Sequence, residues 1–241
     1  MMSGGTMSGG TMSGHGDLDL DLGARPARLL AVCAHPDDES FGLGAVLASL
    51  TGSGVATEVL CFTRGEASTL GEGHTDLGAV RESELAAAAA VLGANRATLL
   101  DYPDGGLDGV ALDDLVEQVR RHARVAGART LLVFDEGGIT GHPDHRRATA
   151  AALAAAEQDD LIVLAWSIPN QVAMALNDEF GAGFVGRSDE ELDLALVVDR
   201  DAQRKAIACH ASQSADNPVL WRRLELLGDL EHLRYLRRSG D

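Results

Sequence analysis

Two short clusters of histidine and aspartate contain the side chains of this sequence that are best suited to chemistry. The first is the segment HPDDE at 35–39, and the second is GHPDH at 141–145. One His-Pro-Asp segment alone is usually a turn or a helix N-terminus, because proline and aspartate favour both. Two such segments, each after an apolar run, indicate a functional site instead.

A divalent metal ion is the cofactor that these side chains are suited to bind. His35, Asp38 and His145 are the natural ligands, and two histidines with one carboxylate leave an open position for water or substrate. Asp37 chelates poorly beside its immediate neighbour, so it is free to act as a general base on the attacking water. Zinc is the expected ion, and the Irving–Williams order leaves Fe²⁺ or another divalent ion open.

The second cluster contains a helix-start signal. Proline is typical of the first helical position, so Pro143 predicts that His142 caps a helix and points into the crevice. Asp144 at the next position suits the helix dipole and is placed to orient a histidine.

The elements that position these residues are predicted from the apolar pattern. Short apolar runs typical of strands buried on both faces lie at 29–33, 55–62, 99–101, 130–134, 161–166 and 194–198. Segments rich in alanine and leucine predict helices at 42–52, 78–92, 111–124, 145–157, 200–211 and 218–237. The alternation predicts an α/β fold, a Rossmann-like three-layer sandwich with a mainly parallel sheet. The clusters follow the first and fourth strands, which are neighbours in many such sheets, so we expect them to converge at the carboxyl edge.

The motifs resemble those of the LmbE-like, or PIG-L, N-deacetylases. AHPDDE at 34–39 and GHPDH at 141–145 are specific together, and the likeness runs from Leu29 to about Gln213. Weaker matches follow in the expected order: TRGE at 63–66, RESEL from Arg81, DYPDGGL at 101–107 and KAIACHASQ at 205–213.

The resemblance implies a zinc-dependent enzyme that removes the acetyl group from an N-acetylglucosamine conjugate. It implies zinc ligands at His35, Asp38 and His145 and a general base at Asp37. It also implies a charge-stabilising histidine at His142, sugar contacts by Arg64 and Asp104, and a pocket position for His210. The implied partner is a small amino-sugar substrate, with an inositol (mycothiol-pathway) or malate (bacillithiol-pathway) aglycone among the candidates. The resemblance is also compatible with a homo-oligomer, because family members often assemble.

One position departs from the mycothiol-pathway members of that family. They have a tyrosine two residues before the GHPDH histidine, and this sequence has Thr140. His142, or another group, then has to carry more of the oxyanion stabilisation. The RESEL residues Arg81, Glu82 and Glu84 are expected to form a solvated helix face with ion pairs.

Other classes of protein fit less well. A nicotinamide oxidoreductase needs a G-x-G-x-x-G turn, but Leu47 occupies the third small-residue position. A serine hydrolase of the G-x-S-x-G type is not indicated. A non-catalytic metal- or sugar-binding protein stays open, as does an amidase of another small amide such as a thiol conjugate. Neither Asp37 nor His142 is needed in a binding protein.

Composition sets the remaining expectations. With 37 acidic and 20 basic residues among 241, the formal net charge is −17, which disfavours nucleic acid and anionic membranes as partners. Three cysteines make no disulfide framework, and no secretory signal or membrane span is apparent, so we expect a cytoplasmic protein. Residues 1–24 contain two MSGGT repeats and predict a flexible tail, followed by a single domain at 25–241.

Overall fold

The computed structural model describes residues 27–70 and 75–240, so the predicted tail at 1–24 lies outside the described residues. Its centre is a seven-stranded sheet with the order β3-β2-β1-β4-β5-β7-β6. The strands are β1 (Arg28–Cys33), β2 (Ala56–Thr63), β3 (Arg96–Tyr102), β4 (Thr130–Phe134), β5 (Ile162–Ser167), β6 (Leu194–Val197) and β7 (Leu230–Arg237). Strands β1 to β5 pair in parallel, as the short apolar runs predict.

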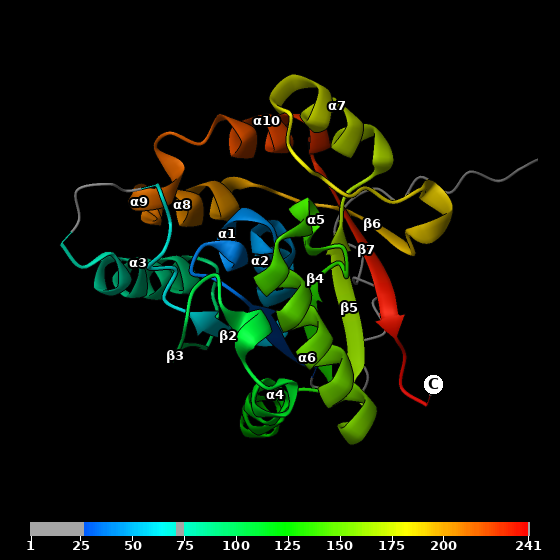
Figure 1. Cartoon of the computed structure of the whole chain (residues 1–241). Coiled ribbons are helices and arrows are strands. Elements are labelled where there is room, and N and C mark those ends of the chain that lie inside the picture. The colour runs from blue at the N-terminus through cyan, green and yellow to red at the C-terminus, as the bar shows by residue number, and fades with distance from the viewer. Residues whose placement is uncertain (1–26, 71–74, 241) are drawn as a thin grey trace, which may run out of the picture.

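Helices cover both faces of the sheet and complete three layers (Figure 1). They are α1 (Asp38–Phe41), α2 (Gly44–Gly52), α3 (Leu77–Val91), α4 (Leu112–Ala126), α5 (Gly138–Gly141), α6 (Pro143–Asp159), α7 (Asn170–Phe180), α8 (Asp201–Cys209), α9 (Ala211–Ser214) and α10 (Pro218–Leu227), with short 3₁₀ helices at Leu107–Gly109 and Asp189–Glu191. Alternate residues of β1 face opposite cores: Leu30 and Val32 pack with α4 and α6, whereas Leu29 and Ala31 pack with α2 and α3. The predicted three-layer α/β fold is confirmed.

The two central strands bring the histidine clusters together. β1 pairs with β4 in parallel, with Leu29 opposite Thr130 and Ala31 opposite Leu132. The loops that leave the carboxyl ends of β1 and β4 therefore start side by side. The first carries residues 34–39 into α1, and the second passes through α5 into α6.

The carboxyl-terminal segment differs from its predicted structure. A single helix at 218–237 is wrong, because α10 ends at Leu227 and Gly228, with a φ of 58°, turns the chain into β7. β7 is antiparallel to both β5 and β6 and lies between them. Helix α7 was not predicted, since no element was assigned to the uncharged stretch after β5.

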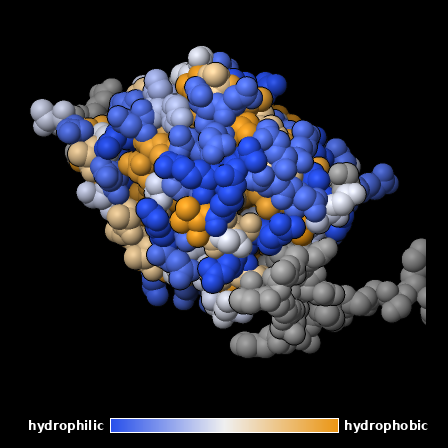
Figure 2. Space-filling view, turned by 90° about the horizontal axis from the view of Figure 1, so that it is seen from below, coloured by the Kyte–Doolittle hydropathy of each residue, from blue (hydrophilic) through white to orange (hydrophobic). Residues whose placement is uncertain are grey.

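On the face shown in Figure 2, hydrophilic residues predominate and apolar residues form small, separate groups. No helix within the described ranges is long and apolar enough to cross a membrane.

Candidate active site

A cavity of about 500 Å³ opens at the carboxyl edge of the sheet, where β1 and β4 end. Six of the predicted site residues line it: His35, Asp37, Asp38, Asp104, His142 and His145. The wall is completed by apolar side chains, which include Phe41, Phe134, Trp166 and Phe184. The sheet thus brings most of the predicted site residues to one cavity, as expected for open parallel sheets.

The loop after β1 holds its two aspartates in different environments. Asp38 begins α1, and its Oδ2 accepts hydrogen bonds of 2.9 Å from the backbone N–H groups of Ala34 and His35. Burial opposes ionisation of Asp38, but the neighbouring histidines and these N–H donors hold the pKa of this carboxyl well below its usual value. Asp37 has a φ of 131°, a strained conformation for a residue with a Cβ.

The ring nitrogens of two histidines are fixed by acceptors on their far sides. His35 Nε2 lies 3.1 Å from Asp104 and 3.3 Å from Asp144 carboxylate oxygens, and His145 Nδ1 lies 3.1 Å from the Gly138 carbonyl. These acceptors require an N–H on His35 Nε2 and on His145 Nδ1. The other nitrogen of each ring then has a free lone pair, as in metal-ligating histidines.

These two free nitrogens face each other and the Asp38 carboxylate. His35 Nδ1 is 3.2 Å from His145 Nε2, which is 3.1 Å from Asp38 Oδ1, and His35 Nδ1 is 3.9 Å from Asp38 Oδ2. Tetrahedral ligands about 2.0 Å from a zinc ion lie roughly 3.3 Å apart. Two facing lone pairs repel unless a cation, either a proton or a metal ion, lies between them. The residues present therefore fit a divalent metal ion.

The pKa of His35 is strongly raised by the carboxylates around it. Burial lowers this pKa, but the carboxylates of Asp104 and Asp144 outweigh burial and raise it to about 10 without metal. Among the described residues, ligand atoms within 4.8 Å of one another form two sets, His35 with His142 and His145, and His35 with Asp104 and Asp144; Asp38 is in neither set. His35 belongs to both, so it connects the metal position to its supporting carboxylates.

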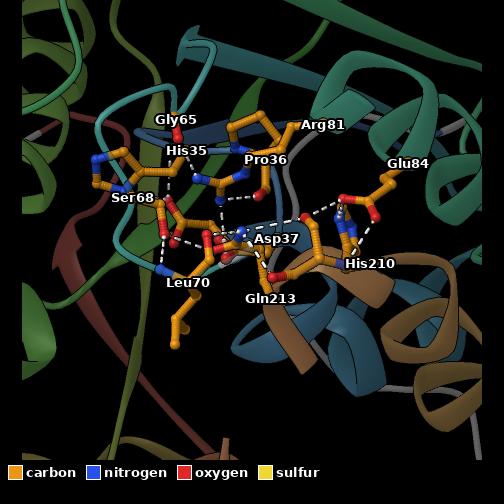
Figure 3. Close-up of polar contacts among 12 residues, drawn as sticks. His35, Pro36, Asp37, Gly65, Ser68, Leu70, Arg81, Glu84, His210 and Gln213 are labelled. Atoms are coloured by element: carbon orange, nitrogen blue, oxygen red, sulfur yellow. Dashed lines mark hydrogen bonds and ion pairs between the residues drawn. The ribbon is translucent and has the colours of Figure 1, made fainter. Parts of the chain in front are cut away.

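Arg81, expected on a solvated helix face, instead lies buried at the site. Its side chain is only 3 % exposed, and it reaches from α3 toward the loop after β1 (Figure 3). Its Nη2 donates to Asp37 Oδ2 at 2.9 Å and to the Pro36 carbonyl, and its Nη1 donates to the Gly65 carbonyl at 2.7 Å. Burial raises the pKa of Asp37 to about 6, and the Arg81 charge opposes part of that rise. Arg81 is thus a buried guanidinium that positions the candidate base, whereas Glu82 is exposed and ion-paired with Arg64, as expected.

His142 caps α6, as Pro143 predicted. Its Nδ1 accepts the backbone N–H of Asp144 at 3.2 Å, so the imidazole is neutral with its hydrogen on Nε2. Burial and the neighbouring histidines lower the pKa of His142, in agreement with that neutral form. Its ring centroid lies 4.8 Å from those of both His35 and His145, and Thr140 lines the cavity beside it.

Asp144 lies beneath the cavity and does not line it. Its carboxylate accepts hydrogen bonds from the backbone N–H groups of Gly105 at 2.8 Å and Leu107 at 3.1 Å. It is fully buried, and its Oδ2 is 3.3 Å from His35 Nε2. In this geometry Asp144 orients His35 and does not touch a substrate.

Sequence comparison identifies the family to which these motifs belong. The PIG-L family, described as GlcNAc-PI de-N-acetylase, matches residues 30–156, which is more than half of the chain. A 1D-myo-inositol 2-acetamido-2-deoxy-alpha-D-glucopyranoside deacetylase from Mycolicibacterium gilvum is 31 % identical over 229 residues, covering 78 % of this chain and 80 % of that protein. The chain belongs to the PIG-L family. A protein of the same description from Salinispora arenicola is 32 % identical, covering 80 % of this chain and 78 % of its own length.

Solved structures share the PIG-L fold at lower identity. A deacetylase of teicoplanin biosynthesis has a TM-score of 0.67 at 21 % identity, covering 89 % of this chain and 100 % of that chain. N,N'-diacetylchitobiose deacetylase from Pyrococcus horikoshii has a TM-score of 0.65 at 22 % identity, covering 87 % and 83 %. A 4-carboxy-2-hydroxymuconate hydratase from Pseudomonas putida has the same TM-score of 0.65 at 20 % identity, covering 89 % and 98 %. The fold therefore carries more than one chemistry, and the side chains have to decide between them.

Two residues predicted from the PIG-L resemblance lie away from the cavity. Arg64 is at the surface, where its Nε and Nη1 are each 2.8 Å from carboxylate oxygens of Asp101 and Glu82. The side chain of His210 is fully buried behind the cavity, 2.6 Å from Glu39, so direct substrate contact by His210 does not match its position (Figure 3).

The buried Glu39 was also missed as a supporting residue. Its carboxylate accepts the backbone N–H of Asp37 at 3.0 Å and the Ser40 hydroxyl at 2.6 Å, besides contacting His210. His210 therefore acts on the site through Glu39, which holds the strained backbone of Asp37. The position of Glu39 directly after Asp37 and Asp38 was the available signal. An acidic side chain in a buried segment is expected to have a paired partner.

Proposed function

We propose that this chain is a metal-dependent hydrolase that removes the acetyl group from an N-acetylglucosamine conjugate, with zinc as its ion. The observation that carries the proposal is the facing pair of free imidazole nitrogens on His35 and His145, with Asp38 beside them. Asp37, a buried carboxylate with a raised pKa, adjoins this ligand set. The relatives that share most of this chain's length carry a deacetylase name, which supports the same reaction.

The metal supplies one part of the chemistry. His35, Asp38 and His145 would hold a divalent ion, which would lower the pKa of a water molecule and polarise the acetyl carbonyl. Asp104 and Asp144 keep His35 in the tautomer that such binding needs, and the Gly138 carbonyl does the same for His145.

Proton transfer is assigned to Asp37. Its carboxylate takes a proton from the attacking water and, once protonated, delivers it to the nitrogen of the departing amine. Arg81 and the carboxylate of Glu39 hold the two ends of this residue, so its position is fixed before substrate binds. The products are acetate and a glucosamine conjugate.

His142 is the donor to the tetrahedral oxyanion. We assign this role to a neutral imidazole: Nδ1 accepts a backbone N–H, so the ring donates through Nε2. A neutral donor cannot also release a proton to the amine without a new proton source, which leaves that step to Asp37. Thr140 at the neighbouring wall brings a hydroxyl and no aromatic ring.

A non-catalytic binding protein remains the alternative class. Such a protein does not need the strained, buried carboxylate of Asp37 or the buried Arg81 that holds it beside the metal ligands. A strained backbone and a buried charge both lower stability. Catalysis explains both features.

The test combines metal analysis with product analysis. Zinc-loaded protein is incubated with N-acetylglucosaminyl inositol, N-acetylglucosaminyl malate and methyl N-acetylglucosaminide, and acetate and free amine are quantified. Release of acetate and amine in equal amounts from at least one of them is expected. Stoichiometric zinc with no acetate from any of the three would overturn the proposal.

A further inference from the structure

A buried arginine on the far wall of the cavity has no role in the reaction as derived so far. Arg223 lies on α10, which packs beside α7 above the carboxyl end of the sheet (Figure 1). The residue is 9 % exposed and lines the same cavity as the metal-ligand set.

The hydrogen-bonding capacity of Arg223 is mostly unused. Its Nη2 donates to the carbonyl of Phe41 at 2.6 Å, and its Nε is buried without an acceptor in the described part of the chain. A guanidinium has five N–H donors, so one accepted bond leaves most of them unfilled. A buried donor without an acceptor costs about 1–3 kcal/mol, and more when the group is charged.

Arg223 also has no directly paired carboxylate among the described residues. Among residues 27–70 and 75–240, no carboxylate lies within ion-pair distance of this guanidinium. The carboxylates of Glu231, Asp37 and Asp38 act on it from farther away, and Glu231 is already bonded to Arg200 and to the indole N–H of Trp166. Burial lowers the pKa of Arg223 to about 10, which leaves it charged at neutral pH.

The surroundings of Arg223 suit a ligand group at the cavity wall. The guanidinium carbon of Arg223 lies 5.2 Å from the ring centroid of Trp166, so one face of the guanidinium contacts the indole ring. Trp166 contacts Phe134 at a centroid distance of 5.4 Å, and Phe134 contacts His145 at 4.9 Å. Arg223 is thus linked to His145 through two aromatic rings and has no direct contact with the ligand set. We therefore expect it to face a part of the substrate away from the acetyl group.

The geometry points to an anionic aglycone: we infer that Arg223 binds a carboxylate or phosphate group of the conjugate, on the side of the cavity opposite the metal ligands. A planar guanidinium with free N–H groups matches both of these oxyanions in a bidentate manner. This inference rests on the proposed deacetylase function and narrows its substrate class. It favours an acidic conjugate over a neutral polyol conjugate.

The test uses two probes of nearly the same size, one with a carboxylate and one with a neutral amide. They are the carboxymethyl glycoside of N-acetylglucosamine and its carboxamide, which has nearly the same shape. With zinc-loaded wild type, we expect kcat/KM for the carboxylate probe to exceed that for the amide probe by about 10–100-fold, mainly through KM, as for hydrogen bonds to a charged group. Isothermal titration with the two deacetylated products gives the same comparison without turnover.

Variants identify the residue responsible. Arg223→Met should remove the preference by lowering kcat/KM for the carboxylate probe more than that for the amide probe. Arg223→Lys should keep part of it, because the charge remains but the fork is lost. Arg222→Met is the matched control: Arg222 precedes Arg223 on α10, is paired with Glu179 and Glu225 at the surface, and should leave the preference unchanged.

The outcomes separate the inference from the function on which it rests. Acetate from both probes at equal kcat/KM in the wild type keeps the deacetylase and overturns the anion site. An equal loss on both probes in Arg223→Met also overturns it, because Arg223 would then act only by holding Phe41. If neither probe releases acetate, the titration alone decides, and equal product affinities would overturn the anion site; the function itself is decided by acetate release from the three conjugates named above.

Discussion

The metal site depends on which nitrogen of each histidine carries hydrogen. Carboxylates hold His35 from one side and a carbonyl holds His145, so each ring presents its lone pair to the other. His35→Ala and His145→Ala should each weaken zinc affinity by more than ~100-fold, since loss of an outer partner alone costs roughly 10–100-fold. Titration with zinc and elemental analysis of purified protein measure this.

The control for the metal experiment is a histidine away from the cavity. His122 is buried on α4, on the opposite face of the sheet from α3, and His122→Gln should keep full zinc stoichiometry. Full stoichiometry in a His35→Ala, His145→Ala double variant would mean that the ion is bound elsewhere.

Asp37 and Asp38 are neighbours with different predicted effects on metal binding. Asp37→Asn should retain zinc but lower kcat by about 10²–10⁴-fold, the range for a positioned proton-transfer group. The measurement is zinc content and acetate release on one preparation. Asp101→Asn, an exposed carboxylate paired with Arg64, serves as the control and should change neither. Near wild-type turnover in zinc-loaded Asp37→Asn would remove Asp37 from the mechanism.

Arg81 is predicted to position Asp37 and not to bind substrate. Arg81→Met should lower kcat by roughly 10–100-fold, the effect of losing hydrogen bonds to a charged group, with little change in KM or zinc content. Arg81→Lys should recover part of kcat because it can still donate to Asp37. Arg120→Met, which removes a surface pair with Asp159, is the control. A change confined to KM would indicate that Arg81 contacts substrate instead.

At the level of elements, the sequence predicted the strands that carry the site and the convergence of both motifs. These strands are buried on both faces, so composition alone marks them. The buried face of α3 was also readable. Gly78, Arg81, Leu85, Ala88 and Ala89 recur at helical spacing, which places Arg81 on the apolar stripe. Its partners could not be predicted, because they come from loops after β1 and β2.

The carboxyl-terminal strand shows why the last element was missed. Residues with helix propensity run on both sides of Gly228 over 218–237, so the sequence shows a single break there. β7 forms because it fills the gap between β5 and β6 and brings Glu231 to Arg200 and Trp166, contacts that are distant in sequence. Tertiary pairing overrides local propensity here.

Glu231 should therefore be a stability determinant of this part of the sheet. Its side chain is fully buried, and its removal leaves the mostly buried Arg200 without its carboxylate partner. Glu231→Gln should lower the free energy of unfolding by about 3 kcal/mol, as for other broken buried ion pairs. Denaturant unfolding followed by circular dichroism measures the change. Glu225→Gln, which breaks an exposed pair with Arg222, should cost less than about 1 kcal/mol; equal effects in both variants would contradict the role of burial.

The charge of the cavity differs from that of the whole molecule. The chain carries a net charge of −17, yet two mostly buried arginines, Arg81 and Arg223, line the cavity. Only one of them has a carboxylate partner in the described residues. Net charge therefore says little about the ligand, and the local contacts of the cavity decide which substrate binds.

The last prediction concerns the first 24 residues. Their repeats of Met, Ser, Gly and Thr offer few apolar side chains to bury, so ordering them would cost more conformational entropy than contacts return. Deleting residues 1–24 removes Asp17, Asp19 and Asp21 as its only acidic side chains. We expect melting temperature within about 2 °C of the full chain, since small surface changes shift stability little, and unchanged acetate release. Calorimetry and the product assay on both forms test this, with size-exclusion chromatography run alongside. A large drop in melting temperature, together with a change in oligomeric state, would show instead that the segment packs between subunits.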